Sequence, residues 1–315
     1  MECAPVSCVA TEVQEALQRR YPQATVEAQP DGRFTVGDHD GSTAIYRIAE
    51  SDSPQQAERV VRIVRSGLLR SLPEGVAAGV TEVVSTDSLG DIILALDTPR
   101  LPNVDVDAES IRQALVALAR MHSVFAGFPA RLTSGLGLLP LGQWLTHDRP
   151  GGDRTVDAGW GAFAARLPQG WAVVEPLLMN PAPLVDALRD CQPTIVQGHV
   201  IPTKLSIMDG TVTFHDWGLA TRGPGALDLG SFVAAVWPIR GLSLADCVET
   251  YRVERARLGR LPSEGERWDR EAALGLLAGV LRHGWMLGEH REALEEWRVY
   301  IALARDAWLT RWPRL

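Results

Sequence analysis

The sequence has little cysteine, and its cysteines are too scattered to build a metal site. Cys3, Cys8, Cys191 and Cys247 form no C-x-x-C pair and no cysteine–histidine zinc spacing. Cys3 and Cys8 are close enough in the chain to bridge, but no other feature indicates an oxidising compartment. We therefore expect free thiols in a reduced cytoplasm.

Long apolar runs and an excess of basic residues are also missing. No apolar run approaches the roughly 20 residues of a membrane span. The first ten residues carry an acid where a secretory signal has basic residues. The formal net charge of −8 argues against a general nucleic-acid binder, which needs a basic surface. We therefore expect a cytoplasmic protein with neither a membrane nor a nucleic acid as partner.

What is present is the composition of an ordinary globular protein. The 315 residues are 46% apolar and 22% charged, which suits one large or two moderate domains. Short β-prone runs separated by turn residues fill the first hundred residues and predict an antiparallel meander followed by two more strands. The predicted strands are 24–28, 33–36, 42–48, 80–84 and 91–96.

Helical patterns accompany and follow these strands. One helix is expected at 11–20, and another begins at a Ser53 cap and runs to about Leu72. Residues 132–157 are rich in glycine and proline and predict loops, whereas 158–188 predict helical segments broken at Pro168, Pro176 and Pro181–Pro183. Further predicted helices are 108–124, 244–258, 267–286 and 291–312.

The most informative stretch is 193–232. Thr194–Val196 predicts a short strand, and Asp209-Gly210 between the alternating runs 205–208 and 211–214 predicts a β-hairpin. The hairpin delivers Asp216 to a strand end beside Gly218. Two interpretations of Asp216 remain open at this point, a metal or phosphate site and an ordinary turn aspartate.

The same stretch contains an ordered series of motif residues. They are Gly198, Pro202, Asp209-Gly210, Asp216-Trp217-Gly218 and Ala226-Leu227-Asp228-Leu229. In this order and spacing they resemble the catalytic core of the aminoglycoside phosphotransferase and choline-kinase-like family, relatives of the protein kinases. The resemblance implies an α+β, bilobal protein-kinase-like fold, with residues 1–98 as a small antiparallel β-sheet lobe. Residues 99–315 would be a larger, mainly helical lobe, and ATP and magnesium would be the cofactors.

Two positions of the catalytic loop depart from the family pattern. His199 takes the place of the catalytic aspartate, and Lys204 takes the place of the metal-binding asparagine. In kinase-type transfer that aspartate accepts the proton of the substrate hydroxyl and the asparagine helps to hold magnesium. Asp216 keeps the position of the other magnesium ligand. Asp228 keeps the position of the residue that braces the loop.

The resemblance also assigns nucleotide-binding positions in the first lobe. Arg47 takes the place of the phosphate-contacting lysine, and Glu58 is the acid that would pair with it. The alternatives are a solvated strand arginine and a surface glutamate favoured by the helix dipole. Backbone groups near Leu94 and Leu96 would meet adenine. His122 matches a helix-end histidine and is expected to be a packed structural residue.

Two functions stay open, so enzymatic activity is not decided by the sequence. One is a pseudokinase, a binding or regulatory component acting with a peptide or protein partner in the modification of a peptide or small molecule. The other is an active atypical ATP-dependent phosphotransferase acting on a hydroxyl of a small molecule or of a peptide Ser/Thr, with His199 and Lys204 in new roles. A cleft occluded by a bond between Lys204 and Asp216 would favour the first.

Overall fold

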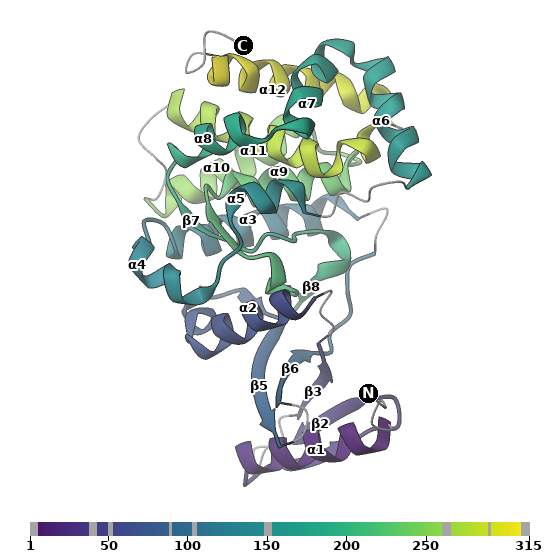
Figure 1. Cartoon of the computed structure of the whole chain (residues 1–315), viewed down its shortest axis with the longest axis vertical. Helices are drawn as coiled ribbons and strands as arrows, with labels where there is room; N and C mark the ends of the chain where they lie inside the picture. Colours follow the sequence, from purple (N-terminus) through teal and green to yellow (C-terminus); the bar gives the residue numbers. More distant parts are fainter. Residues whose placement is uncertain are drawn as a thin grey trace.

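The chain forms two lobes, a small one built on a β-sheet and a larger one that is mainly helical (Figure 1). This arrangement confirms the predicted α+β, bilobal fold. The computed structural model describes residues 6–37, 43–49, 53–87, 90–102, 106–147, 153–259, 266–288 and 291–309. Within these ranges no helix is both long and apolar enough to cross a membrane.

The small lobe is a five-stranded antiparallel sheet in the order β1-β2-β3-β6-β5. Its strands are β1 (Thr25–Ala28), β2 (Arg33–Gly37), β3 (Thr43–Ile48), β5 (Val80–Thr86) and β6 (Gly90–Leu96). All five were predicted within a few residues, because the turn-forming residues between them mark where each strand ends. Helix α1 (Val6–Arg20) packs on one face of the sheet through Val13 and Leu17. It begins earlier than the predicted residue 11.

Helix α2 (Pro54–Arg65) lies between this sheet and the larger lobe (Figure 1). The Ser53 hydroxyl accepts a hydrogen bond from Gln56 N at 3.3 Å, as the predicted cap requires. The helix is shorter than predicted. The Ser66 hydroxyl donates to Ile63 O and accepts from Leu68 N, which turns the chain into the 3₁₀ helix η1 (Leu68–Ser71).

A strand that was not predicted joins the two lobes. β4 (Val76–Ala78) pairs in parallel with β9 (Thr211–Phe214), which forms the predicted hairpin with β8 (Leu205–Met208). Gly79 then leads into β5, donating from N to Phe214 O at 2.8 Å and accepting from Leu96 N at 2.7 Å. The predicted boundary between the lobes at residue 98 stays a prediction. β4 precedes that boundary in the chain, but its hydrogen bonds place it in the sheet of the larger lobe.

The larger lobe is built around two central helices, α9 (Ala226–Val236) and α11 (Glu266–Leu287). Residues 226–235 of α9 are all buried. Helix α7 (Pro168–Met179) continues through Pro176, so the predicted break there is wrong. Asn180 N donates to Pro176 O at 2.9 Å, and the flanking turns hold the helix together.

The remaining helices surround this core or lead into it. The segment predicted as loops contains α4 (Ala130–Thr133), η2 (Ser134–Leu136) and α5 (Leu141–Thr146). The other helices are α3 (Ala108–Val124), α6 (Arg154–Arg166), α8 (Ala182–Arg189), α10 (Leu244–Arg257) and α12 (Arg291–Leu309). Cys191 and Cys247 are free thiols, whereas Cys3 lies outside the described residues.

The loops that carry the candidate site connect short elements of the larger lobe. Strand β7 (Thr194–Val196) pairs antiparallel with β10 (Thr221–Gly223). After β7 the chain forms the 3₁₀ helix η3 (Pro202–Lys204), and after β9 it forms η4 (Trp217–Leu219). The two loops, 197–204 and 215–219, face each other in space.

Candidate functional site

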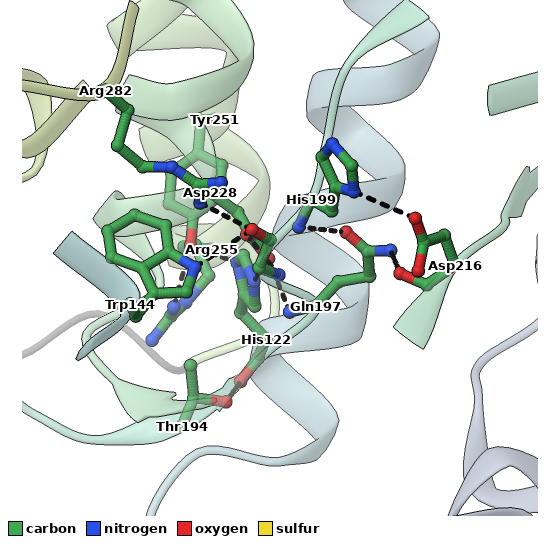
Figure 2. Close-up of polar contacts among 11 residues, drawn as sticks. His122, Trp144, Thr194, Gln197, His199, Asp216, Asp228, Tyr251, Arg255 and Arg282 are labelled. Carbon is green, nitrogen blue, oxygen red and sulfur yellow. Dashed lines mark hydrogen bonds and ion pairs between the residues drawn. The ribbon is translucent and has the colours of Figure 1, made fainter. Parts of the chain in front are cut away.

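Asp228 holds the loop that follows β7. Its carboxylate accepts hydrogen bonds from Gln197 N at 2.8 Å and Gly198 N at 2.9 Å, and its Oδ2 lies 3.0 Å from His122 Nε2 (Figure 2). The Asp228 side chain is fully buried, so these three nitrogens replace the water it has lost. This is the geometry expected of a loop brace.

His122 belongs to the same buried network. Its Nδ1 lies 2.8 Å from the Tyr251 hydroxyl, and its carbonyl accepts from Thr194 Oγ1 at 2.9 Å. Burial lowers the pKa of His122, which keeps the ring neutral, and the charge of Asp228 offsets this only in part. The contacts are those of a packed structural histidine. Tyr251 in turn accepts from Arg255 Nη1 at 3.1 Å (Figure 2).

Gly198 fixes the shape of the loop. Its φ is +88°, and a Cβ added there would lie 2.1 Å from Leu219 O. Its carbonyl accepts from Trp144 Nε1 at 2.9 Å and from Arg282 Nη1 at 2.6 Å. Main chain and side chains therefore hold this residue from both sides.

Gln197 ties the two loops together, and the sequence analysis missed this role. Its side-chain nitrogen Nε2 donates to His215 O at 2.6 Å and to Asp216 O at 2.7 Å. Its amide oxygen accepts from His199 N at 2.7 Å. The only signal in the sequence was its place in the Gln197-Gly198-His199 triplet. That side chain positions His199 relative to Asp216 (Figure 2).

Asp216 is bound by His199 and Lys204, the two residues at which the loop departs from the family pattern. Its Oδ2 lies 2.9 Å from His199 Nδ1 and 3.1 Å from Lys204 Nζ, while Oδ1 accepts from Gly218 N. Burial raises the pKa of Asp216, but the hydrogen bonds and charges of His199 and Lys204 outweigh it and hold the pKa well below its usual range. Asp216 is therefore an ionised carboxylate at neutral pH.

These residues do not fit a magnesium ion. The oxygen that would face the metal already contacts an ammonium and an imidazole, and an ammonium 3.1 Å from it repels a divalent cation. Across the described part of the chain, no three His, Cys, Asp or Glu side chains gather into a possible metal site. The charge that a metal would supply at Asp216 is supplied here by Lys204.

The predicted pair of Arg47 and Glu58 is not formed. The side chain of Glu58 is 63% exposed and pairs with Arg62 one turn further along α2, because it lies on the outer side of the helix. Arg47 instead pairs with Asp97, whose Oδ1 lies 4.0 Å from Arg47 Nε. The contact between α2 and the Asp216 loop is made by Arg59, whose guanidinium donates to Gly137 O at 2.8 Å and to Gly218 O.

The prediction that backbone groups near Leu94 and Leu96 would meet adenine stays a prediction. Side chains alternate along a strand, and Leu94 packs in the core under α1. The N–H of Leu96 is already bonded to Gly79 O. Ile93 and Ala95 are the residues of β6 that line the cavity next to Asp216.

This cavity has a volume of about 280 Å³ and lies between the lobes. The polar part of its lining includes Arg47, Arg100, Lys204, His215 and Asp216. A larger cavity of about 630 Å³ lies between the β8–β9 turn and the ends of α3 and α10, and its lining includes none of the site residues. The smaller cavity is therefore the one that matters for the chemistry of the site.

A buried carboxyl near the Asp228 network predicts a pH dependence of stability. Glu271 on α11 is 1% exposed, and burial raises its pKa from the ordinary 4.5 to about 7, although nearby Arg255 lowers it. The folded protein keeps a proton that the unfolded chain releases, so the free energy of unfolding falls as the pH rises from about 4.5 to about 7. We expect Glu271→Gln to make this fall smaller.

Thermal unfolding at a series of pH values across this window measures the effect. Glu175→Gln, at an exposed position on α7, is the matched control and should follow the wild type. An unchanged pH dependence in Glu271→Gln would show that Glu271 is ionised in the folded protein.

Comparisons with known proteins find similarity in structure only. No protein-family model matches the sequence, and no curated protein resembles it at the sequence level. A microcompartment-associated aminopropanol kinase matches with a TM-score of 0.50 and 15% identity, over 93% of this chain and 95% of that chain. At this identity the likeness shows the fold, which is that of kinase-like phosphotransferases.

Two further solved structures match less closely in TM-score. The choline kinase of Cryptosporidium parvum Iowa II has a TM-score of 0.48 and 10% identity, over 96% of this chain and 97% of that chain. An aminoglycoside phosphotransferase of Alicyclobacillus acidocaldarius has a TM-score of 0.45 and 14% identity, over 91% and 90%.

Proposed function

We propose that this protein is a cytoplasmic pseudokinase of the aminoglycoside phosphotransferase and choline-kinase-like family. It would act as a binding or regulatory component, with a peptide or protein partner, in the modification of a peptide or small molecule. The observation that carries the proposal is the double contact at Asp216, where His199 and Lys204 share one carboxylate oxygen. A carboxylate used in this way is not available to hold magnesium at a nucleotide.

The surrounding structure supports the proposal, because the contacts that hold the loop are kept while its two reactive positions carry other residues. Asp228 and Gly198 keep the loop in place, and Gln197 adds contacts between the two loops. Among the 31 lysine and arginine residues of the chain, Lys204 is the only lysine. A lysine presents a compact point charge, whereas an arginine presents a planar fork, so lysine is the better replacement for a metal ion beside Asp216.

An active atypical phosphotransferase is the alternative, acting on a hydroxyl of a small molecule or of a peptide Ser/Thr. Two observations favour it. The Lys204 side chain is 36% exposed and lines an open cavity, so its charge can still reach a phosphate. Because ionised Asp216 accepts from His199 Nδ1, the other ring nitrogen of His199 is left to take a proton.

Phosphoryl transfer separates the two functions. The protein is incubated with ATP and Mg²⁺, alone and with a Ser/Thr peptide or a hydroxylated small molecule, and the formation of ADP is followed. We expect no ADP above the protein-free control, and an unfolding temperature in ATP that Mg²⁺ does not change. ADP formation that Lys204→Met abolishes would instead establish the phosphotransferase.

Restoring the family residues should restore metal dependence. The double variant His199→Asp, Lys204→Asn removes both contacts to Asp216 and supplies the asparagine oxygen that helps to hold magnesium. We expect ATP to stabilise this variant only with Mg²⁺, by about 2.7 kcal/mol at a hundredfold excess over Kd. The single variants are the controls. A magnesium-dependent shift already present in the wild type would contradict occlusion of Asp216.

A further inference from the structure

The cavity beside Asp216 gathers more positive charge than its acidic residue can balance. Arg47, Arg100 and Lys204 line it together with one carboxylate, that of Asp216. Asp216 is already shared between Lys204 and His199. Like charges confined in one small space repel each other unless an anion lies among them.

Asp97 does not remove this excess at Arg47. Its Oδ1 lies 4.0 Å from Arg47 Nε, whereas its Oδ2 lies 2.8 Å from Arg33 Nε. The stronger contact of Asp97 is therefore with Arg33, which is not part of the cavity lining. The guanidinium of Arg47 remains able to bind an anion.

Arg100, which lines the cavity, has a donor nitrogen without a partner. Its Nη1 is buried and has no hydrogen-bond partner among the described residues. Burial and, to a smaller extent, the nearby charge of Arg47 lower the pKa of Arg100 to about 10, although the charges of Asp97 and Asp216 raise it. A buried cationic donor without a partner is costly, so such a group indicates a missing acceptor.

We propose that this cavity binds phosphate groups directly and without a divalent metal, with Arg47, Arg100 and Lys204 supplying the positive charge. The proposal rests on the proposed function, since it takes Lys204 to replace the metal at Asp216. Arg100 becomes a binding residue that no motif indicated. Arginine suits this role because its planar fork matches the oxygens of a phosphate.

The apolar part of the cavity lining limits the kind of ligand. It consists of Ala49, Val60, Val80, Ile93 and Ala95. A flat apolar ring fits against such a surface, whereas a phosphate does not. A volume of about 280 Å³ suits a compact molecule. The ligand class is therefore a small phosphorylated compound, either a nucleoside phosphate or an oligophosphate.

Calorimetric titration in EDTA with pyrophosphate and with ADP tests the proposal. We expect both to bind the wild type, more weakly as salt is added. Arg100→Met should weaken binding about tenfold or more, and Arg100→Lys should weaken it less. Arg298→Met, which removes an arginine whose side chain is 55% exposed on α12, is the matched control and should bind as the wild type.

The single lysine offers a second readout. An amine-reactive ester can label Lys204 and the chain's amino terminus, since the chain has no other lysine. Bound pyrophosphate should slow the labelling of Lys204 and leave the amino terminus unaffected. Thermal unfolding of Arg100→Met checks that the variant is folded, and we expect no loss of stability because Nη1 has no partner to lose.

The outcomes are distinct. Tighter binding of ADP than of pyrophosphate would support the proposal with a nucleotide as ligand, and equal binding would support it with the oligophosphate alone. No binding of either in EDTA, or unchanged binding by Arg100→Met, would overturn it and leave the pseudokinase proposal intact. Phosphoryl transfer by the wild type would overturn the pseudokinase proposal. The binding measured in EDTA would then still decide whether the cavity binds phosphate without a metal.

Discussion

Replacing Gly198 with alanine is expected to lower the free energy of unfolding by about 3–5 kcal/mol. The new Cβ would lie 2.1 Å from Leu219 O, which is main chain and has little freedom to move. The positive φ of +88° adds a cost of about 1–3 kcal/mol for a residue with a side chain. This sum is a large part of the roughly 5–15 kcal/mol that holds a domain together.

Urea denaturation of Gly198→Ala measures this loss. Gly161→Ala is the matched control, since a Cβ at Gly161 on α6 meets nothing within 4 Å. In an exposed helix position this exchange should stabilise by about 0.5–1 kcal/mol. A stability of Gly198→Ala within about 1 kcal/mol of the wild type would show that the loop can move away from Leu219.

Replacing Asp228 with alanine is expected to have an effect of similar size, about 3–5 kcal/mol. Three donors would lose their acceptor in a fully buried place, namely Gln197 N, Gly198 N and His122 Nε2. Each buried donor left without a partner costs about 1–3 kcal/mol. The loop that carries His199 would also lose its anchor to α9.

Urea denaturation combined with hydrogen exchange checks both parts of this prediction. The amides of Gln197 and Gly198 should exchange faster under native conditions, because they lose the carboxylate that protects them. Asp306→Ala is the control, since that side chain is 63% exposed and pairs with its neighbour Arg305, and it should change stability by less than about 0.5 kcal/mol. Unchanged amide exchange in Asp228→Ala would contradict the bracing role.

The parts of the fold with strong local signals were predictable. Alternating runs around Asp209-Gly210 gave β8 and β9 with their correct bounds, and the apolar stripe of residues 108–124 gave α3. β4 has three residues and pairs with a strand more than a hundred residues away, so no local pattern marks it. Helix α9 is buried on all sides and shows no polar face to reveal its period.

The site was predictable where the family pattern names a residue and less so elsewhere. His199, Lys204 and Asp216 do come together. Lys204 precedes β8 and Asp216 follows β9 at the open end of the same antiparallel hairpin, and Gln197 ties His199 to the loop of Asp216. The outward direction of Glu58 depends on its exact position around the helix. The side of the strand on which Leu94 lies depends on the register, and in a strand a shift of one residue reverses the face. Arg100 lies in an irregular segment, where periodicity gives no guidance.

Gly79 links the two lobes through its main chain. It is bonded to Phe214 on one side and to Leu96 on the other, so the two sheets meet at this residue. The ring of His215 lies close beside it, since a Cβ on Gly79 would lie 1.8 Å from His215 Nδ1. A residue with a side chain at position 79 would therefore displace the ring of the residue that precedes Asp216, so the packing of this junction and the geometry of the cleft depend on each other.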